Sequence, residues 1–218
     1  MSTPKIVGVI FSRADLERAV RLRKPPDLFE LRLDRLINAT IGLLPAPLII
    51  TARDPREGGA TNLSAARRRA LLLEFLPRAA YVDVELRSAK ALEPVLRAAS
   101  ENKVATIISF HDFETTPSAS RLDEIASQAR SLGAAVVKVA TQADTTAQLD
   151  LLLDFWERQR PAGDVVAMGI GKLGRASRLE LARRGNVLNY VHLGSPAASG
   201  QLSIQELRRF ASRRDAVS

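Results

Sequence analysis

One lysine in an apolar setting carries the strongest chemical signal in this chain. The sequence has 6 lysines and 26 arginines, and only Lys138 lies inside an apolar run, at 134–140. Burial there would remove water from the amine, which favours the neutral nucleophile that forms Schiff bases with carbonyl substrates. The alternative is a structural ion pair between Lys138 and either Asp83 or Glu85.

A histidine lies near the end of the preceding apolar run. His111 falls within the segment 107–113, and a histidine beside an imine-forming lysine is suited to general acid and base catalysis. The alternative is a structural histidine that is hydrogen-bonded to Asp112 or Glu57. The other histidine, His192, has no comparable neighbours and is expected to be structural.

Charged residues alternate within two of the predicted strands. Glu30, Arg32 and Asp34 occur at i, i+2 and i+4, which places them on one face of a strand. Asp83 and Glu85 repeat that spacing. Buried charges are costly unless they are paired, so these residues predict either an active site or a structural layer of salt bridges.

Short apolar runs rich in β-branched residues recur eight times and are typical of buried parallel strands. They occupy residues 6–11, 28–33, 47–51, 81–86, 104–110, 135–140, 165–169 and 188–193. Eight strand–helix units in 218 residues give about 27 residues per unit, which suits a compact TIM barrel. We therefore predict an α/β fold with a single (β/α)8 barrel as one catalytic domain over residues 1–218. A doubly wound open sheet is the alternative.

Several ionisable residues lie at the ends of the predicted strands. In a (β/α)8 barrel the active site lies at the carboxyl ends of the strands. Six charged or titratable residues fall at or near those ends: Glu30, Arg32, Arg53, Glu85, His111 and Lys138. Stability alone is a poor explanation for so many converging charges, so we expect the active site there.

Serine-led patterns predict where several helices begin. Four such patterns, with an acidic residue three positions later, start at Ser12, Ser120, Ser177 and Ser203. Further helices are expected over 64–75, 88–99 and 145–156, and Gly133 is expected to end the helix before it. The segment 34–44 fits either a short helix or a loop, and residues 213–218 are expected to form a frayed tail.

One glycine pattern imitates a dinucleotide-binding fingerprint. Gly169, Gly171 and Gly174 match G-x-G-x-x-G after a strand, but residues 186–205 contain no acidic residue at the expected distance. We interpret the pattern as a glycine-rich turn near a ligand the size of a phosphate or another anion.

Composition excludes several classes of protein. The chain has no cysteine, which excludes disulfides, thiolate metal sites and cysteine nucleophiles, and its two histidines argue against a histidine-rich metal site. No apolar stretch approaches the roughly 20 residues of a membrane span. The net charge of +8 is scattered over arginine pairs and triplets that are expected on solvated helix faces, and aromatic residues make up only 5%. We expect a cytoplasmic protein without nucleic-acid or membrane partners.

Seven motifs, in order along nearly the whole chain, resemble the type I 3-dehydroquinate dehydratases, the Schiff-base dehydroquinases of the shikimate pathway. They are Phe29-Glu-Leu-Arg-Leu-Asp34, Thr51-Ala-Arg-Asp-Pro-Arg-Glu-Gly-Gly59, Asp83-Val-Glu-Leu86, Ser109-Phe-His-Asp-Phe-Glu-Thr-Thr-Pro117, Val137-Lys-Val-Ala140, Ser177-Arg-Leu179 and Gly200-Gln-Leu-Ser-Ile204. The resemblance implies a (β/α)8 barrel that dehydrates 3-dehydroquinate to 3-dehydroshikimate by syn elimination, in aromatic amino-acid biosynthesis. It implies no cofactor and no metal, and it suggests a homodimer.

The resemblance also implies roles for individual residues. Lys138 corresponds to the imine-forming lysine, His111 to the general base and acid, and Glu57 to the carboxylate that orients this histidine. The residues that correspond to substrate contacts are Glu30, Arg32 and Arg53 around the ring hydroxyls, Arg178 on the substrate carboxylate and Gln201 on the closing loop. A guanidinium suits a carboxylate because it donates two parallel hydrogen bonds.

Two departures from the family pattern concern the closing loop and the first strand. Ala197 stands where the family often has a serine, and either Ser195 or Ser199 could replace that contact. Val9 stands where some members carry a serine that faces the ligand. The alternative functions are another Schiff-base lyase of the aldolase type and a sensor domain that binds the ligand without turnover.

Overall fold

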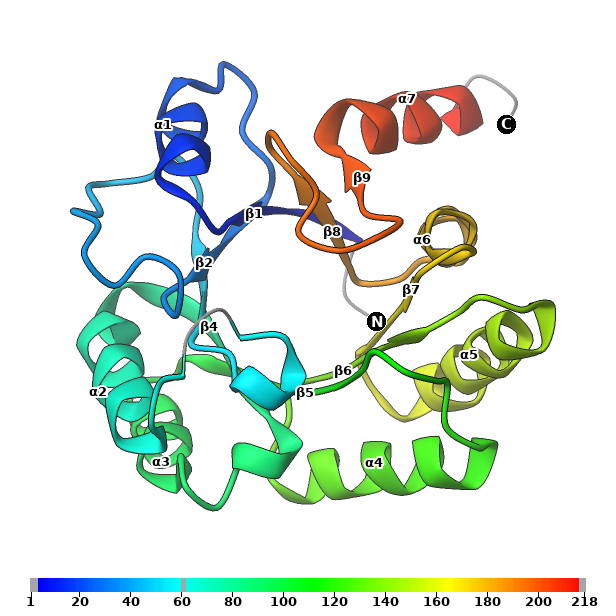
Figure 1. Ribbon diagram of the computed structural model, residues 1–218, viewed down its shortest axis with the longest axis horizontal. Coiled ribbons are helices and arrows are strands. Elements are labelled where there is room, and N and C mark those ends of the chain that lie inside the picture. Colours follow the sequence, from blue (N-terminus) through cyan, green and yellow to red (C-terminus); the bar gives the residue numbers. More distant parts are fainter. Residues whose placement is uncertain (1–3, 60–61, 216–218) are drawn as a thin grey trace.

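The computed structural model describes residues 4–59 and 62–215 of the chain (Figure 1). It contains eight parallel strands followed by a ninth, very short one. They are β1 (Lys5–Ile10), β2 (Leu28–Arg32), β3 (Leu48–Thr51), β4 (Ala79–Glu85), β5 (Ala105–Asp112), β6 (Val136–Gln142), β7 (Val165–Ile170), β8 (Leu188–His192) and β9 (Leu202–Ser203). All eight predicted strands are therefore confirmed, and their ends lie within two residues of the predicted ones.

The strands pair in parallel in the order β7-β6-β5-β4-β3-β2-β1-β8-β9, so β1 to β7 follow one another around the sheet in sequence order. This order, with β1 closing onto β8, is that of a TIM barrel and not of a doubly wound sheet, whose strand order reverses in the middle. The predicted α/β barrel is confirmed.

Seven helices surround the strands as an outer ring in the view down the barrel (Figure 1). They are α1 (Arg13–Arg21), α2 (Ala65–Phe75), α3 (Glu93–Glu101), α4 (Ala119–Ser131), α5 (Thr146–Gln159), α6 (Gly174–Arg184) and α7 (Ile204–Asp215). Four single 3-10 turns accompany them: η1 (Pro55–Glu57), η2 (Leu76–Arg78), η3 (Leu86–Ser88) and η4 (Arg160–Ala162). The segment 33–47 between β2 and β3 forms turns and loop, so the second unit of the barrel has no helix.

Two of the four serine-led helix starts are confirmed. The Ser12 hydroxyl caps α1 by accepting from the backbone N–H of Asp15. Ser203 precedes α7 and exchanges hydrogen bonds with Glu206, whose backbone N–H donates to the Ser203 hydroxyl and whose side chain accepts from the Ser203 N–H. Gly133 follows α4 with φ of 79°, the left-handed conformation expected after a helix end.

The other two predicted helix starts are wrong. Helix α4 is capped by Ser118, not Ser120, because Ser118 is the serine whose hydroxyl reaches the N–H of Arg121. Ser177 lies inside α6, where its hydroxyl donates to the carbonyl of Gly174 in the turn before it.

Three further boundaries differ from the prediction. The segment from residue 88 begins in the turn η3, and α3 starts only at Glu93, next to a proline that is favoured in a first helical turn. The segment 34–44 is a loop. Helix α7 continues to Asp215, so the predicted tail is helical over 213–215, and residues 216–218 lie outside the described part of the chain.

Alternation along the strands separates two layers of buried side chains. One set faces the barrel interior and includes Val7, Ile49, Ile107 and Val166. The other set packs between the strands and the helices, and its largest buried side chain is Trp156. Successive residues of a strand point to opposite faces. Along each strand, every second residue counted from an interior residue toward the carboxyl end therefore also points at the barrel axis.

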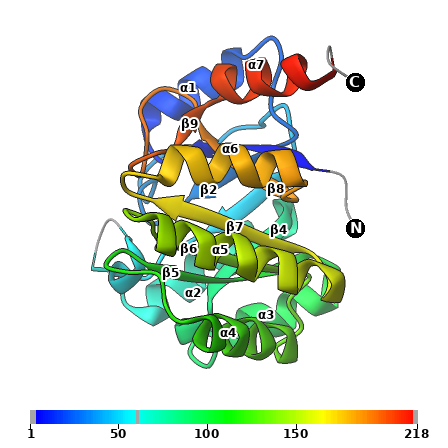
Figure 2. The same ribbon diagram turned by 90° about the vertical axis from the view of Figure 1, so that its right-hand side faces the viewer.

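The barrel closes between β7 and β8 through a side chain. Among the described residues these two strands share no ladder of backbone hydrogen bonds. Instead the buried amide of Asn186 accepts from the N–H of Ala167 on β7, at 3.1 Å, and donates to the carbonyl of Leu188 on β8, at 3.0 Å. Figure 2 shows β7 and α6 on this side of the barrel.

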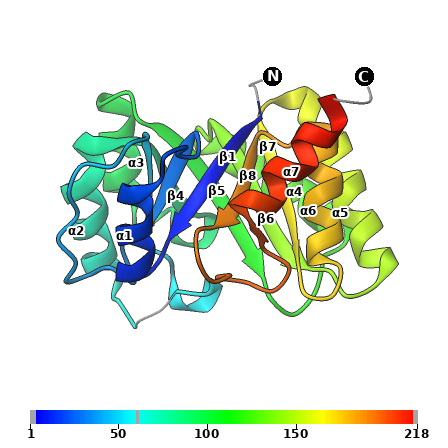
Figure 3. The same ribbon diagram turned by 90° about the horizontal axis from the view of Figure 1, so that it is seen from above.

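No helix of the described chain is both long enough and apolar enough to cross a membrane. Figure 3 shows the strands and helices running side by side through a barrel that is wider than it is tall.

Candidate active site

A cavity of about 290 Å³ opens at the carboxyl ends of the strands. All eight residues that the sequence predicted as site residues line it: Glu30, Arg32, Arg53, Glu57, His111, Lys138, Arg178 and Gln201. They come from β2, from the segments after β3 and β8, from β5, β6 and α6. We call this space the substrate cavity.

Lys138 rises from the middle of β6 into the bottom of the substrate cavity and is only 3% exposed. Its Nζ donates to Oδ2 of Asp83 at 2.8 Å and lies 3.7 Å from Oε1 of Glu30. The face of the Tyr190 ring lies 4.1 Å from Nζ. Of the two ion pairs considered for Lys138, the one with Asp83 is therefore present. Lys138 also lines the cavity, whereas Glu85 pairs with arginines.

Arg53 follows β3 and holds a buried group of carboxylates together. Its guanidinium donates to both oxygens of Asp83, at 3.1 and 3.0 Å, and to Oε1 of Glu85 at 3.3 Å. It also donates to the hydroxyl of Ser109 at 2.7 Å. Burial opposes the charge, but Asp83, Glu85 and Glu30 outweigh it and raise the pKa of Arg53. Burial likewise opposes the charge of Asp83, yet Arg53 and Lys138 hold its pKa well below the usual range.

A second buried arginine supports this group from behind. Arg68 of α2 was expected on a solvated helix face within the arginine triplet 67–69, and that expectation is wrong. Its side chain is 3% exposed and donates to Oε2 of Glu85 at 2.9 Å and to Oδ2 of Asp54 at 3.0 Å. The sequence does hold a signal for this, because Arg68 shares the helix face of Leu71 and Leu72, which are buried in the core.

His111 and Glu57 form a buried pair at the wall of the cavity. Oε2 of Glu57 accepts from the backbone N–H of His111 at 3.0 Å and lies 2.9 Å from its Nδ1. Of the two partners expected for His111, Glu57 is therefore the one found, while Asp112 accepts from the N–H groups of Glu114 and Thr115. With the ring proton on Nδ1, Nε2 presents a lone pair.

Burial shifts the pKa of both members of this pair. Desolvation, helped by the positive charges of Arg53 and Lys138, holds the pKa of His111 well below its usual value, so the ring is neutral near pH 7. Desolvation also raises the pKa of Glu57 to about 7, against the opposing charge of Arg53. Proton uptake by the pair is thus poised near neutrality, as acid–base catalysis requires.

Arg32 joins the strand β2 to the turn that carries Glu57. Its guanidinium donates to both oxygens of Asp34, at 3.0 and 2.9 Å, and to the carbonyl of Gly58 at 3.1 Å. Oδ1 of Asp34 also accepts from the backbone N–H of Arg53. Glu30 and Arg32 therefore share the predicted face of β2 and line the cavity, whereas Asp34 lies in the turn after the strand and holds Arg32 in place.

Arg178 enters the cavity from α6 and has no carboxylate beside it among the described residues. It is 8% exposed, its Nε has no hydrogen-bond partner there, and burial alone lowers its pKa to about 10. The neighbouring Ser177 accepts from the N–H of Gly169, which fixes the start of α6 against β7. A buried guanidinium without a counterion is suited to an anionic ligand.

The glycine pattern next to Arg178 does not form an anion site of its own. Oδ1 of Asp144 accepts from the N–H of Lys172 at 2.7 Å, so a carboxylate of the protein already occupies this turn. Gly171 adopts φ of 92°, which explains the glycine. The interpretation of the turn as a place near an anion therefore rests on Arg178.

Gln201 reaches the cavity from the loop after β8. Its Oε1 accepts from the backbone N–H of Ala197 at 2.7 Å, so the side chain also braces its own loop. Ala197 lines the cavity, as does Val9, whereas Ser195 and Ser199 are not among its lining residues in the described chain. Neither serine lies at the cavity wall in this structure.

Comparison with known proteins decides the family. The family model for type I 3-dehydroquinase matches residues 11–215. The chain belongs to the type I 3-dehydroquinase family. A protein from Thermococcus gammatolerans named 3-dehydroquinate dehydratase is 37% identical over 94% of this chain and 96% of its own length. One of the same name from Methanocella arvoryzae is 31% identical, with 94% of each chain covered.

Solved structures show the same fold for this dehydroquinase. A 3-dehydroquinate dehydratase structure from Geobacillus kaustophilus has a TM-score of 0.85 and 26% identity, covering 99% of this chain and 92% of its own. The type I enzyme from Clostridium difficile has a TM-score of 0.86 at 22% identity, covering 100% and 94%.

One residue of the dehydroquinase cavity did not stand out in the sequence. Tyr190 of β8 lies under Lys138, is 5% exposed, and has no hydrogen-bond partner for its hydroxyl within the described chain. Its strand resembles any apolar strand, so only the register of β8 beside β1 could have placed it in the interior. No group of three or more histidine, aspartate or glutamate residues in the described part of this dehydroquinase could hold a metal ion.

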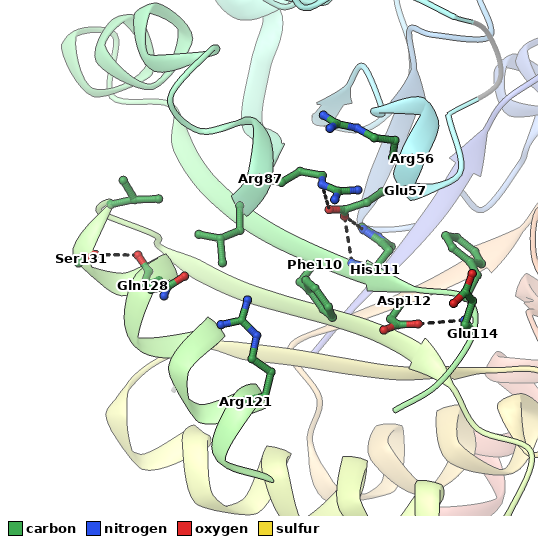
Figure 4. Close-up of a pocket in the computed structure, with 13 residues that line it drawn as sticks. Arg56, Glu57, Arg87, Phe110, His111, Asp112, Glu114, Arg121, Gln128 and Ser131 are labelled. Atoms are coloured by element: carbon green, nitrogen blue, oxygen red, sulfur yellow. Dashed lines mark hydrogen bonds and ion pairs between the residues drawn. The ribbon is translucent and has the colours of Figure 1, made fainter. Parts of the chain in front are cut away.

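A larger cavity of about 760 Å³ lies on the other side of the Glu57–His111 pair (Figure 4). We call it the outer groove. Its lining residues are Arg56, Glu57, Leu86, Arg87, Phe110, His111, Asp112, Phe113, Glu114, Arg121, Gln128, Ser131 and Leu132. It is wider than the substrate cavity, but Lys138, Arg178 and Gln201 do not line it.

Proposed function

We propose that this type I 3-dehydroquinase is a carbon–oxygen lyase that dehydrates 3-dehydroquinate to 3-dehydroshikimate in the shikimate pathway. Family membership and the names of its relatives support the reaction. The observation that carries the mechanism is a single cavity shared by a buried lysine, a neutral histidine and an unpaired arginine.

The first step joins Lys138 to the substrate ketone. The ammonium group of Lys138 gives up one proton, its nitrogen attacks the carbonyl carbon, and a second proton leaves the nitrogen as bond formation proceeds. Both protons end on the former carbonyl oxygen, which leaves as water, and a protonated imine remains. Asp83 and Glu30 lie on one side of Nζ and would then face the positive charge of that imine. This charge acidifies the carbon next to the imine.

The second step removes a proton from that carbon and a hydroxyl from the next one. Nε2 of His111 takes the proton while Glu57 accepts the Nδ1–H and stabilises the resulting imidazolium. The same imidazolium then donates its proton to the departing hydroxyl, which leaves as water. Because one group serves both transfers, proton and hydroxyl leave from the same face. Water finally hydrolyses the protonated imine, which releases 3-dehydroshikimate and restores the lysine ammonium group.

The remaining site residues bind the substrate. Arg178, which has no carboxylate beside it in the described part of the chain, would hold the substrate carboxylate through two parallel hydrogen bonds. Glu30, Arg32, Arg53 and Gln201 would hold the ring hydroxyls and shape the cavity. No cofactor is needed for this chemistry, because the lysine supplies the electron sink.

The test is to incubate the purified protein with 3-dehydroquinate and to follow the ultraviolet absorbance of the conjugated enone. Borohydride added during turnover should fix the ligand on Lys138, as located by peptide mass spectrometry, and should abolish activity. An adduct on Lys172, or none, would overturn the Schiff-base assignment. Imine formation without enone would favour a sensor, and carbon–carbon cleavage an aldolase-type lyase.

The same proposal includes three further properties: residues 1–218 act as one catalytic domain, the enzyme is a homodimer, and it works in the cytoplasm. The family resemblance supports the dimer. Light scattering coupled to gel filtration measures the mass directly, and a monomer of 23.8 kDa would contradict it. Fractionation of cells that make the protein tests the location.

A further inference from the structure

Glu57 forms a thin wall between the two cavities. Glu57, His111 and Phe113 line both the substrate cavity and the outer groove. The carboxylate is 3% exposed, and its Oε2 is engaged by the backbone N–H and the ring of His111. Its other oxygen, Oε1, is reached from the side of the outer groove.

Arg87 is the residue that reaches it. It lies in the turn η3 directly after β4, and its Nε is 3.8 Å from Oε1 of Glu57 (Figure 4). The side chain of Arg87 is 44% exposed, and it does not line the substrate cavity. It therefore faces the catalytic carboxylate from behind, without a path to the substrate.

The other arginines of the outer groove have different partners. Arg56 forms a bidentate pair with Asp54, at 3.0 Å for both hydrogen bonds. Arg121 donates to Glu124 on its own helix at 3.0 Å. Among the described residues of this groove, Arg87 is thus the arginine placed against Glu57.

We propose that Arg87 is a positioning residue of the reaction, which keeps Glu57 ionised and aligned with His111 from outside the substrate cavity. This inference rests on the proposed function, because it assigns Arg87 to the acid–base pair of that reaction. Removing the charge would take away the cation that lies 3.8 Å from Oε1 on the groove side and, among the described residues that face Glu57 from this side, would leave only Arg56, which is paired with Asp54. A protonated Glu57 accepts the Nδ1–H less well and stabilises the imidazolium less.

The electrostatic surroundings of Glu57 agree with this role. The titratable and charged groups that face it are Arg53 after β3, Arg56 beside it in η1, Glu85 on β4, Arg87 in η3 and His111 on β5. Burial raises its pKa to about 7, Arg53 and Arg87 oppose that rise, and Glu85 adds to it. Near neutral pH a small change in charge therefore alters the ionised fraction of Glu57.

The half-exposed position of Arg87 predicts a moderate and salt-sensitive effect. An ion pair open to solvent is weakened by counterions, unlike the buried pairs around Arg53. Added salt should therefore act on the wild-type enzyme in the same direction as loss of the Arg87 charge.

The experiment compares Arg87→Gln with the wild type by measuring kcat at saturating 3-dehydroquinate as a function of pH. We expect the acid limb to move upward by roughly half a pH unit, the size typical of a solvent-exposed pair, with KM nearly unchanged. Arg87→Lys, which keeps a charge, should lie between the two. At about 0.5 M salt, where exposed ion pairs are strongly screened, the wild-type limb should approach that of Arg87→Gln.

Arg121→Gln is the matched control, because it removes an arginine from the same groove without touching Glu57. Its pH profile should overlay that of the wild type. An Arg87→Gln profile that also overlays the wild type would overturn the proposal. So would a change in KM alone, which would indicate a role in substrate binding.

A measurement without substrate separates this proposal from the proposed function. The nitrogen chemical shifts of His111 report the titration of Glu57 in the free protein, and they should shift between wild type and Arg87→Gln but not Arg121→Gln. A wild type that does not dehydrate 3-dehydroquinate would refute the proposed function. Unchanged His111 titration in Arg87→Gln would refute the role of Arg87 alone.

Discussion

Asp83 lies between Lys138 and Arg53 and accepts hydrogen bonds from both, at 2.8 Å from Nζ and at 3.1 and 3.0 Å from the guanidinium. All three side chains are at least 96% buried. Lys138 can therefore lose its charge or react with a substrate while Asp83 keeps a cationic partner, because Arg53 remains. The reverse does not hold, since loss of Asp83 would leave Lys138 with Glu30 alone among the described carboxylates, at 3.7 Å, and would remove the carboxylate that lies between its charge and that of Arg53.

This asymmetry gives a stability prediction. Asp83→Ala should destabilise the fold by about 3–5 kcal/mol, the usual cost of breaking a buried ion pair from one side. Lys138→Met should cost much less, because Asp83 keeps Arg53. Urea unfolding of the two variants measures the difference. Equal losses would show that Lys138 is structurally as important as Asp83.

His111→Ala should lower turnover by about 10²–10⁴-fold, the usual contribution of a general acid and base. Imine formation should persist, because it depends on Lys138, so borohydride should still trap the substrate. Steady-state kinetics and intact-protein mass spectrometry provide the two readouts. His192→Ala is the control, and a larger loss there would mean that the wrong histidine was assigned.

The pKa of Glu57 gives a prediction for stability against pH. Its folded value of about 7 lies above the ordinary 4.5, so the folded state favours the protonated form. Folding stability is therefore lost as pH rises from about 4.5 to 7, with an upper limit of about 3 kcal/mol. Glu57→Gln removes this loss. Thermal melts from about pH 5 to 8, which span the raised pKa, should show the variant gaining on the wild type as pH rises, while its turnover falls. Parallel curves would contradict the raised pKa.

Arg178→Lys should weaken substrate binding although the charge is kept, because an ammonium cannot make the two parallel hydrogen bonds of a guanidinium. A charged hydrogen bond suggests a loss of roughly 1.5–3 kcal/mol. Binding of a substrate analogue without the carboxylate is the control. If that analogue is weakened as much as the carboxylated ligand, Arg178 does not bind the carboxylate.

Gln201→Ala should raise KM, with a smaller loss of turnover than Lys138→Ala. Gln201 braces its own loop through the N–H of Ala197 and faces the cavity, so its loss should act on loop closure and on contacts to the ring hydroxyls. Initial rates over a range of substrate concentrations measure both constants. A loss confined to kcat would contradict this assignment.

The strands and the charged centre of the site were predictable because each has a local pattern in the sequence, whereas the roles of Glu57, Arg178 and Gln201 in the site were expected from the family resemblance alone. β-branched runs revealed the strands, and the spacing of Glu30 and Arg32, or of Asp83 and Glu85, revealed which side chains share the interior face. The lone lysine in an apolar run revealed its own burial. These patterns predict the structure because alternation along a strand determines which side of the barrel each residue faces.

Most of the features that the sequence did not predict depend on contacts between segments that are far apart in the chain. Arg68 is buried because Glu85 and Asp54, far away in sequence, accept its hydrogen bonds. Ser118 was overlooked as a cap because it lacks an acidic partner three residues on, although its hydroxyl accepts from the N–H of Arg121. Tyr190 required knowledge of the register between β8 and β1. A capping pattern or a charge triplet does not carry such information.

The seam between β7 and β8 has a consequence for protein engineering. Since Asn186 bridges the two strands in place of a backbone ladder, the ring depends there on one amide and not on a repeated pattern. A split of the barrel into two fragments within the segment 185–187 would therefore act on this bridge directly, because Asn186 also donates its N–H to Leu181 and Val187 accepts from Lys5. Reassembly of such fragments would bring Arg178 and Tyr190 together from different pieces, so recovered activity would report directly on closure of the ring.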